Sequence, residues 1–166
     1  QSYPTINAVW NYSCGDPGGN YLYYQAVIGD TILNSKNYVH LKVHDNYYSS
    51  NAYYFIREEN KIIYQFNTLD SSELIVFNFN LGIGNKFYSP FCFDSLTVNS
   101  IDSILLENGQ YRKRMNLSNG VLIDTWVEGV GSLNFPIGFI WGWESGGTLM
   151  CFYENFQHLI STYCFY

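Results

Sequence analysis

Basic residues and long apolar runs are both scarce in this sequence. Only 8 of its 166 residues are Lys or Arg, and its formal net charge is -6. Without a basic stripe, nucleic acid and anionic membrane surfaces are poor candidate partners. No apolar run reaches the ~18 residues of a membrane-spanning helix. Gln1 to Pro4 contain neither a positive stretch nor an apolar segment, so we expect a mature chain left after signal-peptide removal.

Catalytic and metal-binding patterns are also lacking. The sequence contains no Gly-x-Ser-x-Gly, phosphate-binding-loop or HExxH motif. His40 and His44 are four residues apart, which on a strand separates them by about 13 Å, too far to bind one ion. His158 is the only other histidine. We therefore expect no metal, no cofactor and no enzymatic activity.

The four cysteines lack the CxxC spacing of a zinc or redox site. An even number without that spacing favours disulfides and an extracellular location. Cys151 and Cys164 flank a predicted hairpin and are expected to pair across it, which leaves Cys14 to pair with Cys92. The alternative is that the cysteines are free buried thiols acting as small apolar side chains.

Aromatic residues are abundant, with 16 Tyr, 12 Phe and 4 Trp. They occur in short apolar runs bounded by Gly, Asn, Asp and Ser, which is typical of antiparallel strands. The whole chain, residues 1–166, is predicted to form a single all-β domain. About ten strands are expected, at Leu22 to Ile28, Asn37 to His44, Ala52 to Arg57, Lys61 to Phe66, Glu73 to Phe79, Thr97 to Glu107, Gln110 to Leu117, Val121 to Val130, Thr148 to Tyr153 and His158 to Cys164.

The connections between these strands are short. Asn108-Gly109 predicts a two-residue type I′ hairpin, whereas Glu58 to Asn60 and Glu154-Asn155 indicate looser turns. Alternation in the strand that begins at Gln110 puts Arg112 and its polar neighbours on a solvent-facing side. An antiparallel meander of this size favours a closed or nearly closed β-barrel, with a two-sheet β-sandwich as the alternative.

One pair of carboxylates resembles the catalytic carboxylate pair of a glycoside hydrolase. Asp124 and Glu128 flank Trp126 on one predicted strand, but their spacing of about 13 Å exceeds the ~5 to 9.5 Å that those mechanisms use. Glu128 with a partner carboxylate elsewhere remains the less favoured alternative to a structural role, in which Glu128 caps backbone donors or pairs with an arginine.

Aromatic side chains in turns and loops are the better functional candidates. Tyr47, Tyr48, Tyr53 and Tyr54 surround a Ser-Ser-Asn segment, and Trp141 and Trp143 lie in the glycine-rich stretch Gly131 to Gly147. Exposed Tyr and Trp beside Asn and Ser form adaptable contact surfaces for glycans or proteins. These six residues are the predicted binding surface, although the same rings could instead pack in the core.

Several segments together resemble an uncharacterised group of secreted Bacteroidota proteins. The matching segments, which span roughly Trp10 to Cys164, are Gly29 to Thr31, Arg57 to Tyr64, Leu74 to Gly84, Thr125 to Ser132, and Cys151 with Cys164. In that group the same segments occur in the same order, often ahead of a C-terminal type IX secretion sorting domain. The resemblance implies export but brings no established activity.

The resemblance also implies O-glycosylation, because the phylum modifies an Asp-Ser/Thr-aliphatic pattern that places candidates at Thr31, Ser95 and Ser103. We expect a secreted or cell-surface domain that acts non-enzymatically in binding, adhesion or assembly. Its partner is expected to be a protein in a surface complex or an extracellular glycan. A barrel-type carrier of small ligands is the main alternative.

Overall fold

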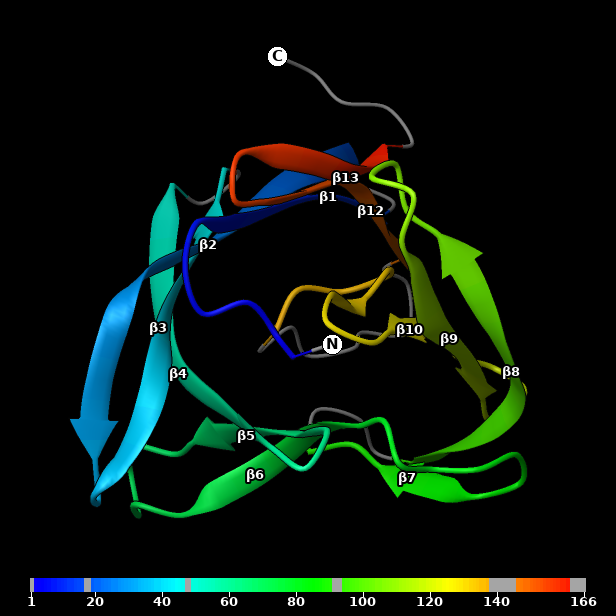
Figure 1. Ribbon diagram of the computed structural model, residues 1–166, viewed down its shortest axis with the longest axis horizontal. Helices are drawn as coiled ribbons and strands as arrows, with labels where there is room; N and C mark the ends of the chain where they lie inside the picture. The colour runs from blue at the N-terminus through cyan, green and yellow to red at the C-terminus, as the bar shows by residue number, and fades with distance from the viewer. Residues whose placement is uncertain (1, 17–18, 47–48, 91–93, 138–145, 162–166) are drawn as a thin grey trace.

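The computed structural model describes residues 2–16, 19–46, 49–90, 94–137 and 146–161. These residues form antiparallel strands and contain no helix (Figure 1), which confirms the predicted fold class. The thirteen strands are β1 (Ala8–Asp16), β2 (Gly19–Leu33), β3 (Lys36–Asp45), β4 (Ser50–Glu59), β5 (Ile62–Phe66), β6 (Glu73–Asn78), β7 (Lys86–Tyr88), β8 (Ser95–Leu105), β9 (Tyr111–Ser118), β10 (Ile123–Val127), β11 (Gly131–Ser132), β12 (Gly146–Glu154) and β13 (Gln157–Ser161).

The strands belong to two sheets. One has eight strands in the order β13-β12-β1-β2-β3-β4-β5-β6, and the other has five in the order β11-β10-β9-β8-β7. The eight-stranded sheet curves as a half-barrel, and the five-stranded sheet covers the remaining side (Figure 1). The structure therefore shares features with both predicted architectures: it has two sheets, as a sandwich does, and its strands surround a common interior, as in a barrel.

Hydrogen bonds connect the two sheets at several points. Beyond β8, the Glu107 amide donates to the Leu159 carbonyl of β13 over 3.1 Å. Lys113 Nζ on β9, the middle strand of the five-stranded sheet, donates to the Phe79 carbonyl, just past β6, over 2.7 Å. A further backbone bond joins the sheets where the Leu149 amide of β12 donates to the Leu133 carbonyl, just past β11, over 2.6 Å.

Asparagine leads three two-residue hairpin turns. Their residue pairs are Asn34-Ser35 (φ 48° and 62°), Asn60-Lys61 (52° and 62°) and Asn155-Phe156 (51° and 63°). Two consecutive positive φ angles are typical of a type I′ turn. The prediction of looser turns after Glu58 and Glu154 is therefore wrong, because the asparagines accept the left-handed conformation.

The Asn108-Gly109 hairpin is confirmed, but its predicted turn type is wrong. Of the two residues, only Gly109 has a positive φ, at 81°. Asn108 instead accepts a hydrogen bond from the Gln110 amide through its side-chain oxygen, over 3.1 Å. With this local hydrogen bond, Asn108 keeps a negative φ angle.

Each of the ten predicted segments overlaps a strand, and three further strands were not predicted. These are β1, β7 and β11. With three and two residues, β7 and β11 are too short to show a pattern. In β1 the pattern is present, because Ala8, Trp10, Tyr12 and Cys14 alternate and are all buried.

Aromatic rings fill the space between the sheets. Trp126 meets Phe77, Phe79 and Phe87 edge to face, with ring centroids 5.2, 6.2 and 4.8 Å away. On the other side, Trp10 contacts Tyr3 at 5.5 Å and Phe152 at 5.2 Å. Part of the aromatic excess therefore holds the two sheets together.

Cys14 contradicts the predicted pairing with Cys92, since it is a free, buried thiol. Its sulfur packs against Gly147 of β12, 3.0 Å from where a Cβ on that glycine would lie. Burial raises the pKa of this thiol to about 12. The alternative of a small apolar side chain holds at this position. Cys92 and Cys164 lie outside the described residues, so the Cys151 to Cys164 disulfide stays a prediction.

Arg112 also departs from its prediction, because it is only 5% exposed. Its Nη2 donates to Gln110 Oε1 over 3.0 Å and lies 4.0 Å from Glu154 of β12. Alternation along β9 did place Met115 and Leu117 in the core. The prediction of a solvent-facing side chain is wrong for Arg112 because the end of β12 approaches this residue.

Candidate functional site

The carboxylates considered for catalysis are held within the protein interior. Asp124 Oδ2 accepts from Trp126 Nε1 over 2.6 Å, and its Oδ1 accepts from the Ser132 hydroxyl over 2.5 Å. Burial raises the pKa of Asp124 to about 6, although these hydrogen bonds oppose the rise. Glu128 is 7% exposed, with Oε1 3.1 Å from Lys61 Nζ. Trp126 is buried, so it offers no open platform to a sugar ring.

The histidines have separate environments. His44 Nδ1 lies 2.9 Å from Asn51 Oδ1, and His158 Nδ1 lies 2.8 Å from Glu107 Oε2. His40 stacks on Phe55, with ring centroids 4.7 Å apart. Within the described ranges, no cluster of three or more His, Cys, Asp or Glu has the arrangement to hold a metal ion.

The predicted aromatic surface is only partly described. Tyr47, Tyr48, Trp141 and Trp143 lie outside the described residues. The other two tyrosines have opposite surroundings: Tyr53 is 53% exposed, whereas Tyr54 packs against the core and its pKa is raised by burial. Tyr53 is thus the member of the pair that is available for contact.

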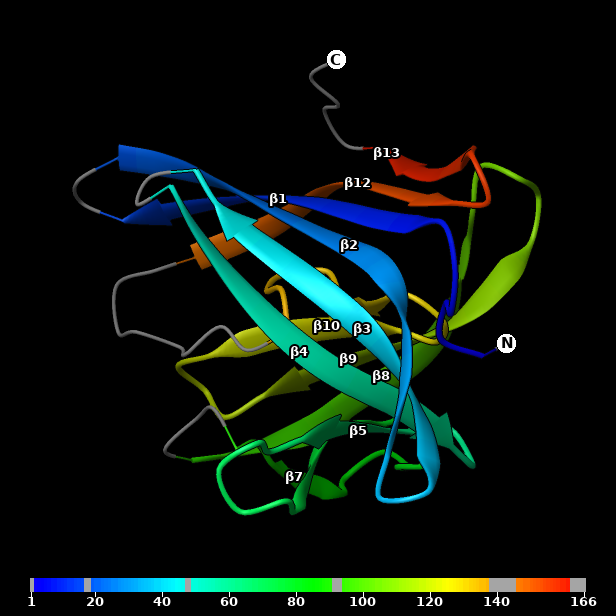
Figure 2. The same ribbon diagram turned by 90° about the vertical axis from the view of Figure 1, so that its left-hand side faces the viewer.

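A row of polar side chains crosses the outer face of the eight-stranded sheet beside Tyr53. The strand register aligns Asn11 of β1 with Tyr24 of β2, Tyr24 with His44 of β3, and His44 with Asn51 of β4. Alternation sends these side chains outward, because their neighbours in sequence, such as Trp10, Tyr12 and Val43, point into the core. Figure 2 shows these four strands side by side.

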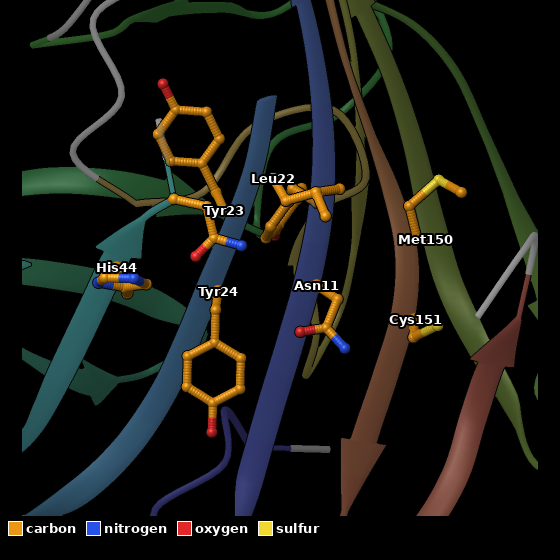
Figure 3. A pocket seen from close by; sticks show the side chains of 9 residues that line it. Asn11, Leu22, Tyr23, Tyr24, His44, Met150 and Cys151 are labelled. Atoms are coloured by element: carbon orange, nitrogen blue, oxygen red, sulfur yellow. The ribbon is translucent and has the colours of Figure 1, made fainter. Parts of the chain in front are cut away.

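This row borders a depression of about 300 Å³, which we call the outer groove (Figure 3). Leu22 and Tyr24 stand at its rim, 45% and 41% exposed. The lining comprises Asn11, Leu22, Tyr24, His44, Asn46 and Met150, with the less exposed Tyr12, Tyr23 and Cys151. None of these described residues is Asp, Glu, Lys or Arg. Within the described lining, the groove therefore offers aromatic surface, amides and an imidazole, without an Asp, Glu, Lys or Arg side chain.

Sequence reasoning missed most of this groove. Asn11 was missed because β1 was not predicted, although its alternation was a readable signal. In the sequence, the spacing of His44 bears only on metal binding, and Tyr24 falls within a predicted strand without any further signal. Their alignment depends on the register of three strands, β1, β2 and β3, which the sequence does not specify.

The O-glycosylation candidates differ in accessibility. Ser103 is exposed on β8, Thr31 is half-buried on β2, and Ser95 is only 8% exposed. The burial of Ser95 argues against attachment of a sugar there. Modification at Thr31 and Ser103 remains a prediction.

Comparison with protein families, with curated proteins and with solved structures gave no match. No helix in the described ranges is long and apolar enough to cross a membrane. The fold and groove together define a class, an antiparallel β domain of barrel-like form with an uncharged aromatic groove on its outer face.

Proposed function

We propose that this protein is a secreted or cell-surface, non-enzymatic binding domain that uses the outer groove to hold an extracellular glycan. The observation that carries the proposal is the row from Asn11 to Asn51, in which an exposed tyrosine ring lies between amide and imidazole groups. The proposed location rests on the sequence resemblance and on the lysine-poor composition.

The chemistry of the groove favours a neutral, polar ligand. A tyrosine ring presents an apolar face at a small cost in conformational entropy. Amide side chains both donate and accept hydrogen bonds, as the hydroxyl groups of a sugar require. Because the described lining residues include no Lys, Arg, Asp or Glu, they supply no fixed charge with which to hold a phosphate, a carboxylate or an ammonium group.

The other candidate functions have less support. The rings of Trp10, Trp126 and their neighbours pack between the sheets, which disfavours a ligand carried inside the barrel. A glycosidase would need Glu128 open to substrate, whereas Glu128 is buried and paired with Lys61. We also propose that glycan binding serves adhesion or assembly at the cell surface.

The experiment is a titration of the protein with neutral oligosaccharides, followed by NMR or calorimetry. Tyr24→Ala and Asn11→Ala should each weaken binding about tenfold, since each removes a ring or an amide from the groove. The matched control is Tyr111→Ala, because Tyr111 is 70% exposed but belongs to the other sheet.

Two results would contradict the proposal. One is equal affinity in the wild-type protein and in both groove variants. The other is hydrolysis of a glycan or peptide that disappears in Glu128→Gln, since that outcome would identify an enzyme.

A further inference from the structure

A further exposed ring lies on the same face of the sheet as the outer groove but does not belong to its lining. This ring is Tyr53 of β4, which pairs with Lys42 of β3. Its neighbour in sequence, Tyr54, packs against the core, so alternation directs Tyr53 to the outer face. The outer face of the eight-stranded sheet therefore carries accessible tyrosine rings both in the groove, at Tyr24, and beyond it, at Tyr53.

The Tyr53 ring is held in place although it is exposed. It contacts the His40 ring, with centroids 5.6 Å apart, and His40 in turn stacks on Phe55 at 4.7 Å. Register accounts for this contact, because His40 of β3 pairs with Phe55 of β4, and Tyr53 lies two residues away on the same strand. A ring held in this way loses little conformational entropy when a ligand covers it. Tyr53 is therefore a preorganised contact.

Polar groups lie between the two tyrosines. Tyr24 of β2 pairs with His44 of β3, which pairs with Asn51 of β4, and Tyr53 follows Asn51 by two residues. His44 Nδ1 and Asn51 Oδ1 are 2.9 Å apart. Two strand spacings and one two-residue step put the backbones of Tyr24 and Tyr53 about 12 Å apart. The order along this diagonal is ring, imidazole, amide and ring.

This separation bears on the length of the ligand. A single sugar ring that stacks on Tyr24 is too short to reach Tyr53, whereas a linear chain of several sugars can cover both. Sugar chains present apolar ring faces and hydroxyl edges, which match the tyrosine rings and the polar groups between them. Lys42, which pairs with Tyr53 on the same face, carries an ammonium group that can donate to further hydroxyls.

We propose, on the basis of the glycan-binding function proposed above, that the ligand is a linear oligosaccharide that extends beyond the outer groove. One sugar lies in the groove against Tyr24, the chain passes over His44 and Asn51, and a later sugar stacks on Tyr53. The protein therefore recognises a stretch of a chain rather than a single terminal sugar.

The test is calorimetric titration of the whole protein with pairs of short and long neutral sugars. The pairs are cellobiose and cellohexaose, laminaribiose and laminarihexaose, and maltose and maltohexaose. At least one hexasaccharide should bind about tenfold more tightly than its disaccharide, because it covers a second aromatic ring.

Variants separate the two contacts. Tyr53→Ala should remove most of the advantage of the hexasaccharide and leave the affinity for the disaccharide unchanged, whereas Tyr24→Ala should weaken both. Tyr53→Phe keeps the ring and should keep the advantage. Tyr88→Ala is the matched control, because Tyr88 is an exposed tyrosine on β7 of the other sheet. Thermal denaturation checks that each variant is folded.

The proposal is overturned if no hexasaccharide binds more tightly than its disaccharide, or if the advantage persists undiminished in Tyr53→Ala. It is also overturned if Tyr53→Ala weakens both sugars equally, because Tyr53 would then act only through the shape of the groove. Disaccharide binding without a gain from length would refute the linear chain and leave glycan binding standing. The absence of binding by every sugar would refute both.

Discussion

Asp124 shows how much one buried polar residue contributes to this fold. Its two oxygens accept from Trp126 of the same strand and from Ser132 of β11. Ser132 Oγ in turn accepts from the backbone amides of Asn134 and Phe135 over 2.9 Å. The carboxylate therefore positions a central core ring and the turn that follows β11, which is a structural role.

The raised pKa of Asp124 makes stability depend on pH in a defined direction. Burial raises this pKa from 3.8 to about 6, so between these values the folded state binds more protons than the unfolded state. The contribution of Asp124 to the free energy of unfolding is present below pH ~4 and is lost as the pH rises through about 6. The expected loss is roughly 3 kcal/mol.

Urea denaturation of the wild-type protein and Asp124→Asn between pH 4 and 7 checks this expectation. The variant has no ionisable group at the site, so the stability difference isolates Asp124 from the other carboxylates. The advantage of the wild-type protein should shrink as the pH rises. A difference that stays constant across this range would show that Asp124 titrates alike in both states.

The second prediction at the residue scale concerns Cys14. Because its thiol is buried and its pKa is about 12, iodoacetamide should leave it unmodified in the folded protein and modify it in urea. Mass spectrometry of a non-reduced digest measures this and also tests the predicted disulfide between Cys151 and Cys164. A cross-linked peptide containing Cys14 and Cys92 would contradict the structure.

At the scale of elements, the contact between β1 and β12 depends on Gly147. A Cβ at this position would lie 2.0 Å from the Asn134 carbonyl oxygen and 3.0 Å from Cys14 Sγ. The approach to Asn134 is closer than atoms tolerate, so β12 or the segment that follows β11 would have to move.

Gly147→Ala should therefore lower the free energy of unfolding by about 2 kcal/mol or more. Gly82→Ala is the control, since its Cβ would meet only Asn85 Oδ1, at an ordinary 3.6 Å. The control should change stability by no more than about 0.5 kcal/mol. Equal effects in the two variants, measured by urea denaturation, would show that β12 adjusts freely.

The predictable parts of the fold are those governed by neighbours in sequence. Alternation and turn residues were enough to find ten strands and the hairpin at Asn108. They did not predict the approach of β12 to Arg112, because Arg112 and Glu154 are more than 40 residues apart in sequence. They also did not predict the free thiol of Cys14, because Cys14 pairs with Gly147, more than 130 residues away. The outer groove was missed for the same reason, since Asn11, Tyr24 and His44 meet only once three strands are in register.

At the scale of the whole molecule, one lysine links the two sheets. Lys113 Nζ donates to the Phe79 carbonyl, linking β9 of the five-stranded sheet to the chain just past β6. Lys61 and Glu128 form a second link nearby, also between the two sheets. These side-chain contacts add to the backbone hydrogen bonds between the sheets at Glu107 and Leu149.

Lys113→Met should cost about 1 to 2 kcal/mol of stability, because it removes the donor of a partly buried carbonyl. It should also speed amide hydrogen exchange in β6 and β9. Lys86→Met, at an exposed position of β7, is the control and should change neither quantity measurably. Unchanged exchange in Lys113→Met would show that aromatic packing alone holds this junction closed.

The position of β1 between β2 and β12 has a consequence for the order in which the chain can fold. β2 to β6 are joined by successive hairpins and can pair as they emerge from the ribosome, but residues 8–16 must wait for residues 146–154 before their second edge is covered. Throughout that interval β1 presents an open edge to other chains. The slowest step of folding, and the most aggregation-sensitive one, should therefore be the late arrival of β12.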